Sequence, residues 1–506
     1  MTDDDIVALL QNDFDALLLD VGSTLVAEAP AGTAVADLRA RPLPGVVELL
    51  RQLAGRVRLA AMTNTATMSA DDVRALLTPI GIGEHLEYIV TSADVGAAKP
   101  DPAVIHVALE LLGVPAARAL VVGDAITDGE SAIAAGASFV ATDRGFSDAL
   151  LRAVTARRGP FGRAVQRVRP LDTSVSSRAS ERLAQLTKPL NSLGQLERVA
   201  EHLAAITGGC PPRIPQSPAV AIFAADHGVV ASGVTPWPQE ITAALVRNFA
   251  SGGAAINAIA RQVGATVHVV DVGVNADLTD MAALRHHKVR LGTDDLAVGA
   301  AMTSAETIRA LDIGATIADD LVAADHDLLV TGDMGIGNTT PSAALIAAFT
   351  GLAAAKVTGR GTGIDDAMLT HKTDIVATAV ERASAFLDPV SIVSEIGGIE
   401  IAALAGFIVG GASHRIPVVV DGVIALAALV VADALVPGVA AHVIAGHRST
   451  EPGASAALDH LGLDPLLDLG MRLGEGTGAC LAIPIVQCAA RILTDMATLD
   501  SLMPPA

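Results

Sequence analysis

The chain has 506 residues, which is too long for one hydrophobic core and indicates two to four domains at roughly 150 residues each. Hydrophobic residues make up 51% and charged residues 18%, which excludes a disordered or fibrous protein. The 34 basic and 55 acidic residues give a net charge of −21, so we expect neither nucleic acid nor a membrane as a partner. Three cysteines without a CxxC spacing and an acidic amino-terminal segment predict a cytoplasmic protein.

The fold class follows from the same composition. Aromatic residues are only 2%, so the core must be built from Ala, Val, Leu and Ile. Short apolar runs alternate with helical patterns throughout, which is typical of parallel α/β sheets covered by helices. We therefore predict two α/β domains, each with a parallel sheet.

A basic stretch divides the chain. Six arginines without an acid lie between Arg152 and Pro170, together with Gly159, Pro160 and Gly162. In an acidic chain this pattern predicts an exposed linker over residues 152–172, between a domain at 1–151 and a domain at 173–506. An arm that binds phosphate is the alternative interpretation.

Polar side chains follow the apolar runs of the first domain. The candidates are Asp20, Thr63, Lys99, Asp124 and Asp128. Because the carboxyl ends of parallel strands meet at one edge of a sheet, we expect these side chains to form one site. A nucleophilic carboxylate, a hydroxyl, a lysine and an acidic pair suit Mg²⁺-assisted phosphoryl transfer.

In their order, these elements resemble the haloacid dehalogenase-like hydrolases over about residues 14–150. The resemblance implies that Asp20 is the nucleophile, that Thr63 and Lys99 bind phosphate, and that Mg²⁺ is held by acidic side chains, namely Asp20, Asp124 and Asp128. One departure is Gly22, which stands where phosphatases of the family carry an acid/base Asp. Either the domain is a phosphohydrolase with a weakened site, or it is inert and serves assembly or regulation.

The second domain carries two glycine-rich loops. A strand-like run ends at Asp333, and Gly335, Gly337 and Asn338 follow it directly before an alanine-rich helix. A second loop contains Gly361 and Gly363, with Lys372 following on a helix. Backbone N–H groups ahead of a helix bind anions, so both loops and Lys372 are candidate phosphate ligands. Neither loop matches the GxGxxG or GxxxxGK[ST] pattern, so NAD and ATP have no support.

Glu475 is a candidate general base. It lies between Gly474 and Gly476, ahead of an apolar helix, where partial burial should raise its pKa towards neutrality. A helix-capping role is the alternative. Asp226 and His227 follow another strand-like run and could contact substrate, with packing as the alternative role.

Eight motifs then occur in order over residues 173–506: TKPLNSLGQLE, ADHGV, GVTPWPQEIT, SGGAAIN, GDMGIGNTT, GRGTG, EIGGIEIAALAGFIVGGA and MRLGEGTGA. Together they closely resemble the nicotinate-nucleotide–dimethylbenzimidazole phosphoribosyltransferases of cobalamin lower-ligand synthesis. The resemblance implies a Rossmann-like sheet, a homodimer, no metal or redox cofactor, and Glu475 as the catalytic base. Asp333 stands where the family commonly has Glu, and we expect it near the reacting sugar.

The whole chain is thus expected to hold two Rossmann-like parallel-sheet domains joined by a basic linker. The implied reaction transfers phosphoribose from nicotinate mononucleotide to 5,6-dimethylbenzimidazole, giving α-ribazole 5′-phosphate and nicotinate. The first domain could then hydrolyse that product. A competing hypothesis is a Mg²⁺-dependent phosphohydrolase whose larger domain is only a binding platform.

Overall fold

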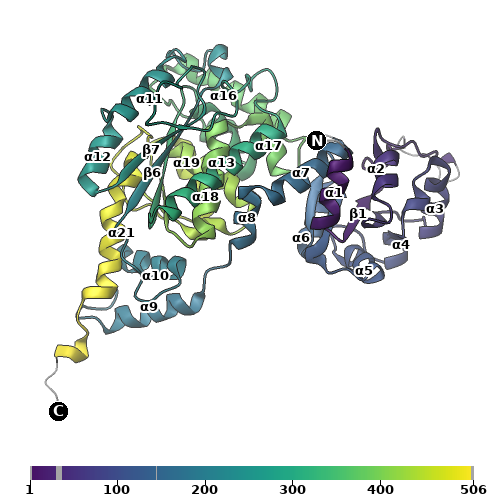
Figure 1. The fold of residues 1–506 in the computed structure, drawn as a ribbon, viewed down its shortest axis with the longest axis horizontal. Helices are drawn as coiled ribbons and strands as arrows, with labels where there is room; N and C mark the ends of the chain where they lie inside the picture. The colour runs from purple at the N-terminus through teal and green to yellow at the C-terminus, as the bar shows by residue number, and fades with distance from the viewer. Residues whose placement is uncertain (1–2, 30–32, 34–36, 144, 503–506) are drawn as a thin grey trace. The chain divides into compact units, whose positions relative to one another are not determined.

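The computed structural model describes residues 3–29, 33, 37–143 and 145–502. The chain forms two compact units, one of Met1–Arg158 with Ala385–Ser391 and one of Gly159–Ser384 with Ile392–Ala506 (Figure 1). Each unit contains one sheet in which every paired strand is parallel. The predicted α/β class with two Rossmann-like sheets is therefore confirmed.

The first unit has a five-stranded sheet with the order β3-β2-β1-β4-β5. Its strands are β1 (Ala16–Asp20), β2 (Arg58–Thr63), β3 (Tyr88–Thr91), β4 (Ala119–Gly123) and β5 (Ser138–Ala141). Its helices are α1 (Asp3–Asp13), α2 (Val46–Leu53), α3 (Ala70–Leu77), α4 (Ser92–Val95), α5 (Ala103–Leu112), α6 (Ile126–Ala135) and α7 (Phe146–Arg158). The strand order reverses beside β1, so the ends of β1 and β4 open a crevice where such sheets bind ligands.

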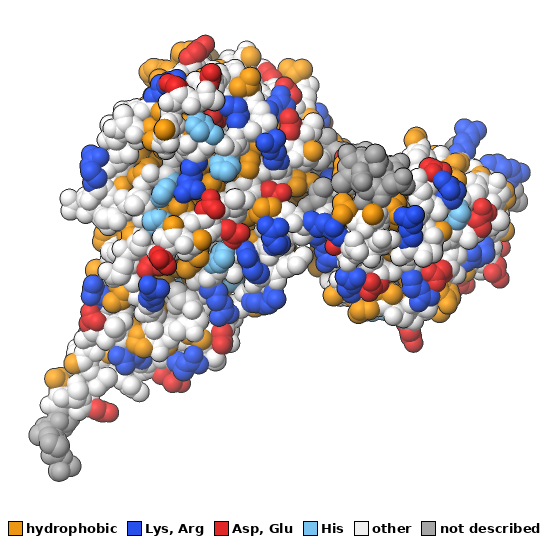
Figure 2. All heavy atoms as spheres, in the orientation of Figure 1, with side chains coloured by type: hydrophobic (Ala, Val, Ile, Leu, Met, Phe, Trp, Pro, Cys, Tyr) orange, Lys and Arg blue, Asp and Glu red, His pale blue; other side chains and the backbone are white. Residues whose placement is uncertain are grey.

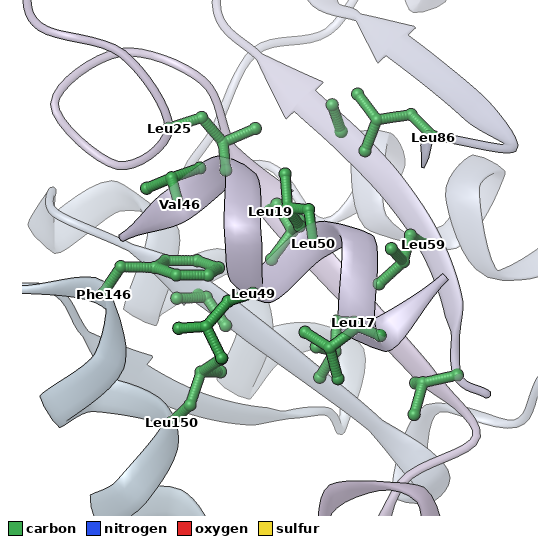
Figure 3. Close-up of a cluster of buried hydrophobic side chains, with 14 of the residues drawn as sticks. Leu17, Leu19, Leu25, Val46, Leu49, Leu50, Leu59, Leu86, Phe146 and Leu150 are labelled. Carbon is green, nitrogen blue, oxygen red and sulfur yellow. The ribbon is translucent and has the colours of Figure 1, made fainter. Parts of the chain in front are cut away.

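Both faces of this sheet are buried, which explains why its strands read as continuous apolar runs. Leu17 and Leu19 of β1 point to one face, where they pack with Leu49, Phe146 and Leu150 from the covering helices (Figure 3). The alternate residues of β1, Ala16 and Leu18, belong to the core on the opposite face. The period of two thus delivers Asp20 to the strand end with its backbone fixed on both sides.

The second unit has a six-stranded sheet with the order β11-β10-β9-β6-β7-β8. Its strands are β6 (Pro218–Ala225), β7 (Thr266–Gly273), β8 (Arg285–His286), β9 (Leu328–Met334), β10 (Val418–Val420) and β11 (Val443–Ala445). The helices from Gly159 onward are α8 (Pro160–Arg167), α9 (Thr173–Gln185), α10 (Gln195–Thr207), α11 (Ile241–Ser251), α12 (Ala255–Val263), α13 (Ser304–Ala323), α14 (Thr339–Thr350), α15 (Ala354–Val357), α16 (Asp366–Ala383), α17 (Pro389–Ile396), α18 (Ile399–Ser413), α19 (Val423–Leu435), α20 (Pro452–Leu461) and α21 (Thr477–Asp495). The strand order reverses between β6 and β9, which places the ligand crevice of this sheet at their carboxyl ends.

Small residues replace aromatic ones in the helix packing of the second unit. A Cβ on Gly314 of α13 would lie 1.8 Å from the carbonyl oxygen of Ala403, and one on Gly406 of α18 would lie 2.0 Å from that of Leu311. The two helices therefore approach so closely that their backbones touch (Figure 1). Close helix packing of this kind builds a dense core from a chain with few aromatic residues.

The basic stretch is not the exposed linker that we predicted over 152–172. Residues 146–158 and 160–167 are helical as α7 and α8, and only Gly159 and residues 168–172 of the stretch are irregular. Arg152 is 3% exposed and forms ion pairs with Asp143, Asp148 and Asp388 within the first unit. Arginines without local acids find carboxylates elsewhere in an acidic chain, so their run does not mark an irregular segment.

Within residues 3–29, 33, 37–143 and 145–502, one helix is long and apolar enough to span a membrane. This is α21, and 56% of its apolar window is buried inside the second unit, as expected for a core helix. The apolar segment at 418–436 forms β10 and the buried helix α19. On the face drawn in Figure 2, basic and acidic side chains are interspersed over the second unit rather than gathered by sign.

Candidate active site

A cavity of about 410 Å³ opens in the second unit at the crevice where β9 ends. The residues that line it come from the loops after the strands and from α11: Trp237, Ile241, Leu245, Asp333, Met334, Gly335, Ile336, Asn338, Thr339, Gly361, Thr362, Gly422, Val423, Ile424, His447, Ser449, Glu451, Arg472, Leu473, Gly474 and Glu475. One part of the wall is apolar, and the rest carries glycines and carboxylates. The cavity can therefore hold a flat apolar group and a polar, charged group together.

Glu475 is placed in this cavity by a turn of unusual conformation. Its φ is +63°, and Gly474 and Gly476 on either side have φ of +80° and +85°. A left-handed glutamate costs about 1–3 kcal/mol and is retained where the surrounding structure imposes it. The side chain is 8% exposed and its Oε2 has no hydrogen-bond partner among the described residues. Burial raises the pKa of Glu475 to about 6, against a hydrogen bond from the backbone of Ile256 that lowers it.

Two further acids lie against the Glu475 turn. A Cβ on Gly474 would lie 3.2 Å from Oδ2 of Asp333, so this carboxylate borders the turn directly. Asp421 accepts hydrogen bonds from the backbone N–H groups of Gly476 (3.2 Å) and Ala479 (2.8 Å), which fixes the start of α21. Burial raises the pKa of Asp333 well above its usual value, and the negative charge of Asp421 raises it further. The cavity floor is thus acidic, and burial opposes the ionised form of its carboxyl groups.

The opposite end of the cavity is an anion cradle. Gly335, Gly337, Gly361 and Lys372 line a smaller pocket that shares its wall with the main cavity. Lys372 is 2% exposed, and its Nζ donates to Oγ1 of Thr339 (2.7 Å) and to the carbonyl oxygen of Gly359 (3.2 Å). Burial lowers the pKa of Lys372 to about 8. A buried ammonium whose hydrogen bonds go to neutral oxygens is a binding point for an anion.

The second unit is similar in sequence and structure to known phosphoribosyltransferases. A family model described as phosphoribosyltransferase matches residues 168–502. The nicotinate-nucleotide–dimethylbenzimidazole phosphoribosyltransferases of Salinispora tropica and Mycolicibacterium paratuberculosis are each 50% identical, over 66% and 65% of this chain and 95% of their own lengths. The crystal structure of CobT from Thermus thermophilus is similar with a TM-score of 0.64 at 46% identity, covering 66% of this chain and 100% of that one.

The chain belongs to the nicotinate-nucleotide–dimethylbenzimidazole phosphoribosyltransferase family. It is a phosphoribosyltransferase of the glycosyltransferase class, and the cavity is the candidate active site of that family domain.

Most of the predicted residues of the phosphoribosyltransferase domain lie together. Glu475, Asp333, Gly335, Gly337, Asn338, Gly361 and Lys372 all line the cavity or its adjoining pocket. Asn338 also donates from Nδ2 to Oδ2 of Asp333 at 3.0 Å, which orients that carboxylate. Gly363, Asp226 and His227 do not line either space. Asp226 and His227 are 2% and 0% exposed, so both are buried behind the cavity wall rather than on it.

Sequence reasoning missed several residues of the cavity wall. Gly422 of the wall follows β10 together with the supporting Asp421, and His447, Ser449 and Glu451 of the wall follow β11. The rule that polar side chains gather after parallel strands would have found both groups, but these strands are only three residues long. Glu451 accepts a hydrogen bond from Gly361 N–H (2.9 Å), and Arg472 donates to the Gly361 carbonyl (2.8 Å). Both side chains therefore hold the second glycine loop.

The first unit brings its predicted acids together. Asp20, Asp124 and Asp128 each present a carboxylate oxygen, and these oxygens lie within 4.8 Å of one another. Lys99, 6% exposed, forms ion pairs with Asp20 and with Asp128, the latter at 2.5 Å. Burial raises the pKa of Asp20 to about 7, although the charge of Lys99 opposes the shift. An all-oxygen donor set of this size fits a hard divalent cation such as Mg²⁺.

Two other positions bear on this site. Thr63 ends β2 and is partly exposed, next to Asn64, whose Oδ1 accepts from the backbone N–H of Lys99 (2.9 Å). At Gly22, no described atom lies within 4 Å of the place that a Cβ would take, so the space for an acidic side chain is open. A model of haloacid dehalogenase-like hydrolases matches residues 30–142, and the unit is therefore a haloacid dehalogenase-like domain. The match begins after Asp20.

Proposed function

We propose that this chain transfers phosphoribose from nicotinate mononucleotide to 5,6-dimethylbenzimidazole, giving α-ribazole 5′-phosphate and nicotinate. The observation that carries the proposal is the common cavity of Glu475, Asp333 and the glycine loops beside Lys372. The substrates are those in the names of relatives that are 50% identical over nearly their whole length. A plain phosphohydrolase would have no use for an apolar slot bordered by a carboxylate of raised pKa.

In this proposal the nucleotide phosphate occupies the cradle. The loop from Gly335 to Gly337 precedes the amino terminus of α14, whose dipole favours an anion. Lys372 contributes the positive charge, because its buried Nζ donates to two neutral oxygens, at 2.7 and 3.2 Å. The phosphate would raise the pKa of Lys372 again and so bind most tightly to the protonated form.

The acceptor base would lie in the apolar part of the cavity. Trp237, Ile241 and Leu245 line that wall, and Trp237 is 47% exposed, which leaves part of its ring free to cover a flat heterocycle. Glu475 would accept the ring proton of dimethylbenzimidazole while the other ring nitrogen bonds to C1′ of the ribose. The nicotinate leaves as a neutral pyridine whose nitrogen takes the bonding electrons, so no acid catalyst is needed.

Asp333 would stabilise the positive charge that develops on the sugar. The neighbouring carboxylates oppose its ionisation in the free protein, as its raised pKa indicates. A cationic pyridinium or an oxocarbenium-like ring in the cavity relieves that repulsion, so the acids favour the charged transition state over the empty site.

The test is direct. Purified full-length protein is incubated with nicotinate mononucleotide and dimethylbenzimidazole, and the products are identified by mass. We expect α-ribazole phosphate and nicotinate in equal amounts. Consumption of the nucleotide without a base adduct would contradict the proposal. We also expect a homodimer in the cytoplasm, as in the family that the chain resembles, and light scattering checks the dimer.

A second activity is favoured by the acidic cluster of the first unit. We propose that this unit hydrolyses a phosphate ester, with the transferase product as the candidate substrate. Asp20, Asp124 and Asp128 would hold Mg²⁺, which when bound neutralises phosphate charge. Lys99 would bind the phosphate beside it. The alternative of an inert unit for assembly or regulation is favoured by Gly22.

The two alternatives are separated in the full-length chain. With Mg²⁺ and α-ribazole phosphate, a hydrolase releases phosphate, and Asp20→Asn abolishes the release while transfer of phosphoribose continues. If the parent releases no phosphate and Asp20→Asn changes only the assembly of the protein, the inert alternative holds.

A further inference from the structure

A buried histidine and glutamate form a pair outside the cavity wall. His227 follows β6, Glu400 lies in the first turn of α18, and both side chains are 0% exposed. His227 Nε2 and Glu400 Oε1 are 2.8 Å apart. The mechanism proposed above uses neither group, and neither lines the cavity or the cradle.

The imidazole ring lies between two glycines. A Cβ on Gly335 would be 3.0 Å from His227 Nε2, and one on Gly398 would be 2.6 Å from His227 Cε1. Gly335 is in the first glycine loop, directly after Met334, so that loop rests on the ring. On the other side, Gly398 is the N-cap of α18, and its lack of a side chain lets the backbone lie close to the ring. The Ala225 carbonyl, 2.4 Å from the Gly335 Cβ position, fixes the loop against β6, and the ring with the carboxylate that holds it supports the loop beside that contact.

The backbone of the same residue reaches a second cavity wall. The carbonyl oxygen of His227 accepts a hydrogen bond from Nε2 of Gln239 at 3.1 Å. Gln239 lies two residues after Trp237, which lines the apolar part of the cavity. One residue thus contacts the segment that carries the apolar slot and the loop that carries the anion cradle.

Stability is a poor explanation for this pair. Among the described residues, His227 Nδ1 and Glu400 Oε2 have no hydrogen-bond partner. Buried ion pairs with unsatisfied atoms are commonly no more stable than apolar side chains of similar volume. The contact of the ring with Gly335 suggests that the pair serves to position the loop rather than to stabilise the fold.

We propose that His227 and Glu400 are positioning residues that hold the Gly335 loop at the height where it binds the nucleotide phosphate. The inference rests on the proposed transfer reaction. It assigns no proton transfer to either group, since both act through the loop that they support.

The test uses the full-length double variant His227→Leu/Glu400→Met. Replacing both partners keeps the core filled, so its melting temperature should match or exceed that of the parent. The KM for nicotinate mononucleotide should nevertheless rise about 10- to 100-fold, since a displacement near 1 Å costs that much. The KM for dimethylbenzimidazole should not change. A purely structural role would lower kcat with the folded fraction and leave both KM values alone.

A second variant covers the case in which the double variant does not fold. Gly398→Ala removes no charge, and its extended backbone accepts alanine, but the new methyl presses on the ring. The same selective rise in nucleotide KM is expected. Glu400→Gln keeps the hydrogen bond to His227, so its nucleotide KM should stay near that of the parent.

The matched control is another histidine–carboxylate pair on the same helix. His414, directly after α18, is 2.5 Å from Asp319, and neither residue lines the cavity or the cradle, so His414→Gln/Asp319→Asn should leave both KM values unchanged. The inference is overturned if Gly398→Ala and the double variant keep a nucleotide KM within about twofold of the parent.

Calorimetric binding of nicotinate mononucleotide separates the proposed positioning role from the proposed transfer reaction. Failure of transfer by the parent refutes the reaction, whereas an unchanged Kd in the variants refutes only the positioning role.

Discussion

Replacing Glu475 with Gln tests the carboxylate on which the proposed transfer depends. Gln has the same shape, keeps the hydrogen bond to the backbone of Ile256 through its oxygen, and cannot accept the proton of the base. Removing a general base commonly costs about 10²–10⁴-fold, so we expect kcat to fall by at least about 100-fold. The KM for the nucleotide should change little, because its phosphate binds at the other end of the cavity.

The pH dependence of kcat/KM is a second test of Glu475 as the general base. With a pKa of about 6, Glu475 is about 90% ionised at pH 7 and about 10% ionised at pH 5. The base form is the ionised one, so kcat/KM should fall about tenfold between these values. A glutamate at the ordinary 4.5 would lose only about a quarter of its activity over the same range.

The assay is nicotinate release followed by chromatography at constant ionic strength from pH 5 to 8. Glu475→Asp is the control, because aspartate tolerates the left-handed backbone at φ +63° and keeps a carboxylate. The Asp variant should have a lower kcat but still show the fall of kcat/KM towards pH 5. The Gln variant should not show this fall. If Glu475→Gln keeps more than about a tenth of the parental kcat, the assignment of the base is wrong.

Three further substitutions test other parts of the molecule. Lys372→Met should raise the nucleotide KM about 10- to 100-fold, since a buried hydrogen bond to a charged group is worth about 1.5–3 kcal/mol. In the parent the same KM should rise above pH 8, where the Lys372 ammonium, with its pKa of about 8, deprotonates. A nucleotide KM that does not depend on pH would count against Lys372 as the phosphate ligand. Gly22→Asp fills open space and should raise Mg²⁺-dependent phosphate release by about 10²–10⁴-fold if the first unit is a hydrolase, measured with malachite green, and no increase favours the inert unit. Arg152→Met leaves three aspartates without their cation and should lower the free energy of unfolding of the first unit by about 3–5 kcal/mol in urea titration, with Arg51→Met on the surface as the control that should change it little.

The parallel sheets and much of the site could be predicted because strand ends are visible in the sequence. Asp20 and Asp333 each follow a short apolar run that forms a parallel strand. The carboxyl ends of such strands lie at the ligand crevice, so the position of these carboxylates follows from the strand alone. Glu475 could be predicted for a different reason, since flanking glycines signal a special turn and an apolar helix signals burial. Local chemistry was sufficient at these positions.

Long-range packing could not be predicted in the same way. In the sequence, Arg152 is part of a basic run that indicates exposure. In the structure it is buried against Asp388, which is 236 residues away. For His227 the sequence left substrate contact and packing as alternatives, because its buried partner Glu400 is 173 residues away. Gly363 resembled Gly361, but only the latter faces the cavity. In each case the deciding partner comes from a distant element.

The discontinuity of the first unit bears on how the protein is made. Ala385–Ser391 belongs to the same unit as Met1–Arg158, and Asp388 supplies one of the three carboxylates around Arg152. At about 5–20 residues per second, a ribosome needs roughly 20–80 s to reach Ser391 after it starts. Until then the nascent amino-terminal part holds a buried arginine short of a counter-ion, so this unit is expected to finish folding late, although it is translated first.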